Sequence, residues 1–127
     1  MTKAAPTVTF RVDFANGVRL GPGKVQLLRL IAEHGSIRAA GAAMGMSYRR
    51  AWLLGDEINR MFTQPSIATR HGGKSGGGAG LTEFGEALLA RVQKMEAATR
   101  VALGSDVDWL NQAIDLDFRS NGRGEDL

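Results

Sequence analysis

The chain has 127 residues, 43% of them hydrophobic, and contains no cysteine. This length predicts one domain with or without a tail, and the lack of cysteine excludes disulfides and thiolate metal sites. Residues 19–100 hold 12 Lys and Arg against 6 Asp and Glu, whereas residues 101–127 hold 2 against 6. A basic body fits a polyanionic partner, although an ordinary solvated surface can carry the same charge. The sequence shows neither an apolar run near 18 residues nor a secretory signal, so we expect a cytoplasmic protein without a membrane span.

Apolar and polar residues alternate from Val8 to Phe14, which predicts a half-buried strand. Asn16-Gly17 follows, the strongest short signal for a hairpin turn, and Val18 to Leu20 can return as the second strand. We therefore assign residues 1–20 to an N-terminal β-hairpin.

Two helices are predicted before the glycine at position 45. The first covers residues 23–34, and Gly35 suits a left-handed C-terminal stop. The second has Ser36 as its N-cap and runs to Met44. Gly45 then permits the positive φ that a tight turn needs.

A third helix is predicted over residues 48–63, with Ser47 as its N-cap. Its apolar side consists of residues at helical spacing: Ala51, Leu54, Ile58 and Met61. Trp52 and Phe62 have many apolar neighbours, so we assign both rings to the core rather than to base stacking. With the preceding helix and turn, this helix completes a helix-turn-helix, in which Gly41 stands where the two helices cross. Alanine is more usual at that position, and glycine should weaken the helix by roughly 1 kcal/mol.

The segment after Pro65 has the order of a wing, with a possible strand at residues 66–70 and a glycine-rich loop at residues 71–80. Thr82 caps a fourth helix that should reach about residue 103.

Gly104-Ser105 should break the fourth helix, and a short acidic helix is predicted at residues 106–118. The predicted fold class is mainly α with a small β component, a winged helix-turn-helix. The DNA-binding domain then spans residues 21–103, and an acidic tail spans residues 104–127.

The polar and basic start of the third helix indicates what it binds. In a helix-turn-helix, the first turn of the second helix enters the DNA major groove. Arg49 and Arg50 can pair with the O6 and N7 acceptors of guanine, and Tyr48 can reach phosphates or base edges. Donors in the wing suit phosphates, and the glycines let the chain approach closely. The predicted DNA-binding residues are Ser36, Ser47, Tyr48, Arg49, Arg50, Arg70, His71, Lys74 and Ser75.

Other functions fit the sequence less well. Residues 68–75 match a loose phosphate-loop pattern, but Lys74-Ser75 runs into glycines that cannot hold the required helix. His71 and His34 lie in different elements, so we predict no metal site, and we also predict no catalytic set and no cofactor. A winged helix that contacts proteins through its acidic tail stays open as an alternative, although Arg49, Arg50 and Lys74 argue against it.

The segments GSIRAAGAAMGMSYRRAWLLGDEINRMF and GGKSGGGAGLTEFGEALL resemble the N-terminal DNA-binding domain of the ModE family of molybdate-responsive regulators. The most specific parts are Ser47-Tyr48 with Ala51-Trp52, and the glycine wing followed by Leu81-Thr82 and Phe84-Gly85. The resemblance covers about residues 20–100 and implies a winged helix that binds a palindromic operator in double-stranded DNA as a homodimer. LysR-type regulators resemble the chain more distantly and normally lack this glycine wing.

Two further expectations concern the end of the chain. Leu88, Val92 and Met95 form a stripe on a helix too long for one small core to cover, so we expect them to form the core of the dimer. Full-length ModE members carry C-terminal molybdate-binding domains, whereas the 27 residues that follow residue 100 here hold 6 acidic against 2 basic residues. An acidic segment is a poor host for an oxyanion, so we expect no molybdate site and identify no effector.

Overall fold

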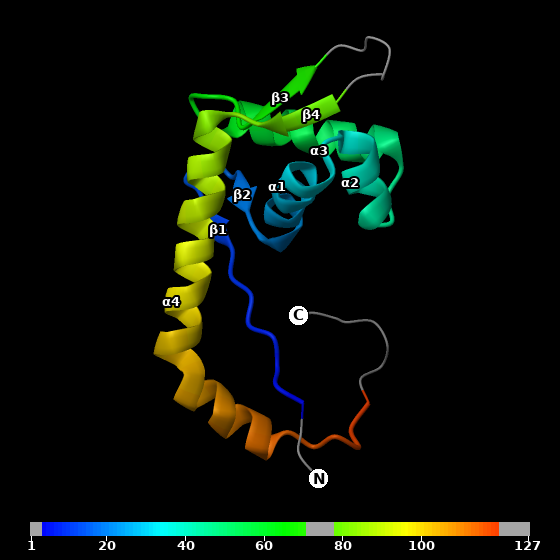
Figure 1. The fold of residues 1–127 in the computed structure, drawn as a ribbon. Helices are drawn as coiled ribbons and strands as arrows, with labels where there is room; N and C mark the ends of the chain where they lie inside the picture. The colour runs from blue at the N-terminus through cyan, green and yellow to red at the C-terminus, as the bar shows by residue number, and fades with distance from the viewer. Residues whose placement is uncertain (1–3, 71–77, 120–127) are drawn as a thin grey trace. The chain divides into compact units, whose positions relative to one another are not determined.

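The computed structural model describes residues 4–70 and 78–119. Its elements in chain order are β1 (Val12–Asp13), β2 (Arg19–Leu20), α1 (Pro22–His34), α2 (Ile37–Ala43), α3 (Tyr48–Met61), β3 (Ile67–Arg70), β4 (Gly78–Leu81) and α4 (Glu83–Ala113). The described residues form four helices and two small antiparallel hairpins, a mainly helical fold, and the predicted winged helix-turn-helix is confirmed (Figure 1). Within the described residues, no helix has the length and apolar character needed to cross a membrane.

The described residues divide into two compact units. One comprises residues 9–97, which contain the helix-turn-helix, both hairpins and the first half of α4. The other comprises residues 4–8 together with residues 98–119. The division into residues 1–20, 21–103 and 104–127 stays a prediction.

Local signals determine where the helices of the helix-turn-helix begin and end. The Ser36 hydroxyl accepts a hydrogen bond from the backbone N–H of Ala39 at 2.9 Å, so Ser36 is the N-cap of α2. Ser47 caps α3 in the same way. Gly35 and Gly45 have φ angles of 78° and 75°, the left-handed region that favours glycine. The predicted bounds of these three helices are therefore confirmed to within two residues.

The larger core cluster joins the three helices to the wing. Its buried members come from α1, α2, α3, β3 and β4: Leu27, Leu28, Leu30, Ile31, Ile37, Ala40, Ala51, Ile58, Ile67 and Ala79. On the predicted apolar side of α3, Ala51 and Ile58 are fully buried, whereas Leu54 and Met61 are partly buried. This burial leaves the opposite side of α3 exposed.

Helices α2 and α3 cross more closely than alanine would allow. A Cβ atom on Gly41 would lie 2.6 Å from the Cβ of Ala51, well inside van der Waals contact. Gly41 therefore permits the close crossing of the two helices, besides the weakening of α2 that its helix propensity predicts.

We predict that Gly41→Ala lowers the free energy of unfolding by about 1–3 kcal/mol, the usual cost of overpacking. Helix propensity alone would give the opposite sign, a gain of roughly 1 kcal/mol. Urea unfolding of the two proteins measures the difference, and a more stable variant would contradict this packing.

The N-terminal hairpin is shorter than its sequence pattern indicates. Its strands contain two residues each and pair in the register Val12↔Leu20 and Asp13↔Arg19. Val8 and Phe14, at the two ends of the alternating run, are exposed, and a strand with period two extends only where one face is covered. The turn at Asn16-Gly17 is confirmed, since Gly17 has a φ angle of 89°.

A second core cluster lies under the hairpin and contains Leu20, Val25 and Val92. Val92 is only 3% exposed, so it supports the fold of its own subunit and offers little surface to a partner subunit. Leu88 is partly buried and packs against both clusters, whereas Met95 is 38% exposed. Dimer contacts by the stripe of Leu88, Val92 and Met95 on α4 stay a prediction.

Phe62 is partly buried and packs against this second cluster, as expected. Its ring lies 6.1 Å from that of Phe14 and 5.6 Å from that of Phe84, both measured between centroids. The aromatic contacts join the N-terminal hairpin to the end of α3 and the start of α4.

The predicted break at Gly104-Ser105 is wrong, because α4 runs without interruption from Glu83 to Ala113. One glycine inside a helix costs only about 1 kcal/mol relative to alanine, and the surrounding helical residues outweigh that cost. The predicted separate helix at residues 106–118 is instead the end of α4, which stops five residues earlier.

Residues 98–119 contain no buried side chain. The large apolar residues exposed there are Val101, Leu103, Trp109, Leu110, Ile114, Leu116 and Phe118. The Asn111 amide donates a hydrogen bond to the carbonyl oxygen of Ala4 at 3.3 Å, which joins the two chain segments of this unit.

Candidate nucleic-acid interface

Helix α3 has a buried side and an exposed side. Tyr48, Trp52 and Leu53 are 44%, 45% and 47% exposed, and Arg49 is exposed beside them. The assignment of Trp52 to the core is therefore wrong. The neighbouring Ala51 fills the space against α2, and the next position is rotated by about 100° along the helix, out of the core.

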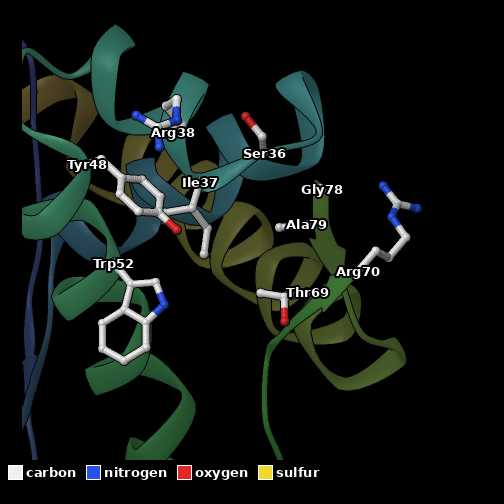
Figure 2. Close-up of a pocket in the computed structure, with 9 residues that line it drawn as sticks. All are labelled: Ser36, Ile37, Arg38, Tyr48, Trp52, Thr69, Arg70, Gly78 and Ala79. Atoms are coloured by element: carbon white, nitrogen blue, oxygen red, sulfur yellow. The ribbon is translucent and has the colours of Figure 1, made fainter. Parts of the chain in front are cut away.

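A polar groove with a volume of about 400 Å³ opens between α2, α3 and the wing strands. The residues that line it are Ser36, Ile37, Arg38, Tyr48, Trp52, Thr69, Arg70, Gly78 and Ala79. Figure 2 shows Tyr48 and Trp52 on one side of the groove, with Thr69 and Arg70 on the other. The indole nitrogen of Trp52 lies on the edge of the ring that faces the groove (Figure 2).

Hydrogen bonds hold the walls of this groove in place. The backbone N–H of Ala79 in β4 donates to the carbonyl oxygen of Gly35, just before α2, at 2.8 Å. The Asn59 amide of α3 donates to the carbonyl oxygen of Ile67 at 2.9 Å, and its oxygen accepts from the N–H groups of Ser66 and Ile67 at 2.9 and 2.8 Å. The wing is thus hydrogen-bonded to α3 and to the junction between α1 and α2.

The groove carries positive charge without a carboxylate among the described residues that line it. The guanidinium carbon of Arg38 lies 4.3 Å from the ring centroid of Tyr48, a cation–π contact worth about 0.5–1 kcal/mol at an exposed site. Arg70 lies over its cross-strand partner Gly78, where a Cβ atom would come within 3.2 Å of its Nη2. Two guanidinium groups with the hydroxyls of Ser36, Tyr48 and Thr69 form a set of donors suited to phosphate oxygens.

The structure gathers some of the predicted DNA-binding residues and separates others. Ser36, Tyr48 and Arg70 line the groove together. Arg49 lies on the exposed side of α3, and Arg50 lines a different cavity. The remaining predicted residues are Ser47, which caps α3, and His71, Lys74 and Ser75, which lie outside the described residues.

Sequence reasoning missed three polar or aromatic side chains that line the groove, and also Asn59, which supports it. Trp52 stands four positions after Tyr48, and this helical spacing is the signal that could have placed both on one side. Arg38 follows the N-cap of α2 by two positions, which marks it as a first-turn residue near Ser36. Thr69 and Asn59 carry no comparable signal, because their roles depend on how the wing packs against α3.

Metal and nucleotide sites find no support in the described part of the chain. Residues 4–70 and 78–119 contain no group of three possible metal-ligating side chains. A phosphate loop would also need a helix across residues 78–81, where β4 pairs with β3 instead.

Comparison with known proteins adds an independent line of evidence. The chain is 40% identical over 90 residues to the molybdenum-pterin-binding protein MopA of Rhodobacter capsulatus, which covers 71% of this chain and 34% of MopA. It is 28% identical over 120 residues to the molybdenum transport protein ModE of Azotobacter vinelandii, which covers 94% of this chain and 44% of that protein. It is 38% identical over 68 residues to the DNA-binding transcriptional dual regulator ModE of Escherichia coli strain K12, which covers 54% of this chain and 26% of that regulator.

No protein-family model matches the chain. The chain spans about a third of the length of the curated relatives it matches, and the names of those described above denote regulators, transport proteins and molybdenum-pterin-binding proteins rather than enzymes. The chain is therefore a homologue of the ModE regulators and of the molybdenum-pterin-binding Mop proteins.

Proposed function

We propose that this chain is a sequence-specific DNA-binding transcriptional regulator of the ModE type. It acts in the cytoplasm as a homodimer on a palindromic operator in double-stranded DNA and has no enzymatic activity. The observation that carries this proposal is the groove beside α3, which joins two guanidinium groups and three hydroxyls without a carboxylate among its described lining residues.

Helix α3 has the size and side chains needed to read DNA. An α-helix with its side chains is about 10–12 Å across and fits a major groove about 12 Å wide. Arg49 can pair with a guanine edge, and the exposed Trp52 and Leu53 can contact thymine methyl groups. Arg38 and Arg70 then bind phosphates of the backbone that passes between α3 and the wing.

Two ligands other than DNA could bind the polar groove, an acidic protein segment and a small oxyanion. An acidic protein segment could engage the arginines, but it would not use the exposed reading side of α3 in a sequence-dependent way. An oxyanion such as molybdate would occupy the positions of the DNA phosphates in the groove and would compete with DNA.

The proposed function predicts a steep salt dependence, because residues 19–100 carry a net charge of +6 from 12 basic and 6 acidic residues. Each DNA phosphate neutralised contributes about 0.9 to the slope of log K against log salt, so about four contacts give a slope near −4. Shift assays on genomic DNA fragments between roughly 50 and 200 mM salt measure this slope. A flat slope, or no binding to any fragment at the lowest salt concentration, would sink the proposal.

A further inference from the structure

A second cavity, with a volume of about 560 Å³, lies on the side of α3 opposite the polar groove. The N-terminal hairpin, the start of α1, the turn before α3 and α3 itself contribute to its walls. Four of its lining side chains are basic: Arg11, Arg19, Lys24 and Arg50. Glu57 is the only carboxylate among the described residues that line it.

Two arginines of the hairpin are held at the rim of this cavity. The aliphatic stem of Arg11 lies over Gly21, where a Cβ atom would come within 3.1 Å of the Arg11 Cγ. The carboxylate of Asp13 lies 2.7 Å from the Nε of Arg11 and 3.9 Å from the Nε of Arg19. One carboxylate thus faces two guanidinium groups, and the three groups together carry a net charge of +1. Both arginine side chains are at least half exposed.

Lys24 is a positioning residue that fastens the hairpin to α3. Its ammonium group donates to the carbonyl oxygen of Arg19 at 2.9 Å and lies 3.0 Å from the carboxylate of Glu57. The Lys24 side chain is only 15% exposed, whereas that of Glu57 is 53% exposed. The contact of Phe14 with Phe62 holds the turn end of the hairpin as well.

A helix that lies in the major groove has a phosphate backbone along each of its two sides. The polar groove lies along one side of α3, and the hairpin arginines Arg11 and Arg19 lie along the other side. We propose that Arg11 and Arg19, together with Arg50, bind phosphates of the DNA backbone on the side of α3 away from the wing. This inference rests on the proposed function and changes the role expected for Arg50 from base pairing to backbone contact.

The test replaces Arg19, whose side chain is 62% exposed, with alanine and measures binding to specific and random DNA. We expect Arg19→Ala to weaken both about 3- to 10-fold and to reduce the salt slope by about 1, the change for one lost phosphate contact. Arg91→Ala is the matched control, because it removes the same charge from an exposed position on α4 that borders neither cavity. The control should keep the wild-type slope.

Each outcome decides the assignment. An Arg19→Ala protein with the same affinity and slope as Arg91→Ala overturns the inference and leaves the proposed function standing. A loss confined to specific DNA also overturns it, because backbone contacts carry no sequence information. If the wild-type protein binds no DNA, both proposals fail together. Arg11→Ala repeats the measurement should Arg19→Ala lower the unfolding temperature.

Discussion

Replacing Gly85 with alanine is expected to lower the free energy of unfolding by about 3 kcal/mol, a large part of the stability of a small domain. The added Cβ atom would lie 2.1 Å from the carbonyl oxygen of Ser66 and 2.9 Å from its carbonyl carbon. These are backbone atoms, so no side chain can rotate aside to make room. Ser66 is also fully buried and bound through its N–H to Asn59.

The start of α4 cannot slide away from this contact without losing hydrogen bonds. The backbone N–H of Thr82 donates to the Ser66 carbonyl at 2.9 Å. The Thr82 hydroxyl donates to the Pro65 carbonyl at 2.7 Å and accepts from the N–H of Gly85 at 2.9 Å. We therefore expect the Gly85→Ala protein to lose the wing geometry, and DNA binding with it.

Gly104→Ala is the control, because it lies in the same helix with no atom within 4 Å of the added Cβ. It should stabilise the protein by about 0.5–1 kcal/mol, the usual gain of alanine over glycine in a helix. Urea unfolding gives both values. If Gly85→Ala raised the free energy of unfolding, as Gly104→Ala is expected to do, the close contact between Gly85 and Ser66 would be wrong.

Trp52→Ala is expected to weaken operator binding about 10- to 100-fold while leaving the fold intact. The side chain is 45% exposed on the reading side of α3 and belongs to neither core cluster. Its ring can bury apolar surface against the DNA, and burial of about 100 Å² of such surface stabilises a complex by about 2.5 kcal/mol. Under the proposed function, in which Trp52 contacts thymine methyl groups, the loss should be larger on operator DNA than on random DNA.

The chain contains only two tryptophans, so fluorescence separates their environments. In Trp109→Phe, the remaining Trp52 emission should change when DNA is added. In Trp52→Phe, the remaining Trp109 emission should stay nearly constant, because Trp109 lies in α4 and borders neither cavity. A DNA-dependent change in the emission of Trp109 alone would argue that α3 does not enter the major groove of DNA.

Sequence reasoning succeeded where the controlling interaction is local. The caps at Ser36 and Ser47 bond to groups three residues away, and Gly35 and Gly45 follow from their own backbone angles. The helices around them could therefore be predicted to within two residues.

Sequence reasoning failed where distant segments decide the outcome. The sequence shows only that glycine at position 41 lowers the helix propensity of α2. The close approach of Gly41 to Ala51 depends on how two helices pack, so no local pattern predicts it. No sequence pattern predicts the role of Asn59, since its hydrogen bonds run to residues seven and eight positions away on the wing. The local preference at Gly104 costs only about 1 kcal/mol and therefore does not break α4, which its surrounding helical residues hold together.

The hydrogen bonds of Asn59 fix the angle between α3 and the wing in the DNA-free protein. The entropic cost of aligning α3 with the wing is therefore met during folding and does not reduce the affinity for a ligand. The side chains at positions 49, 52 and 53 face solvent and take no part in that alignment. Under the proposed function, substitutions at these three positions should change the preferred operator on an unchanged scaffold. A change at Asn59, by contrast, would alter how far apart on the DNA the helix and the wing can make contact, whatever sequence α3 reads.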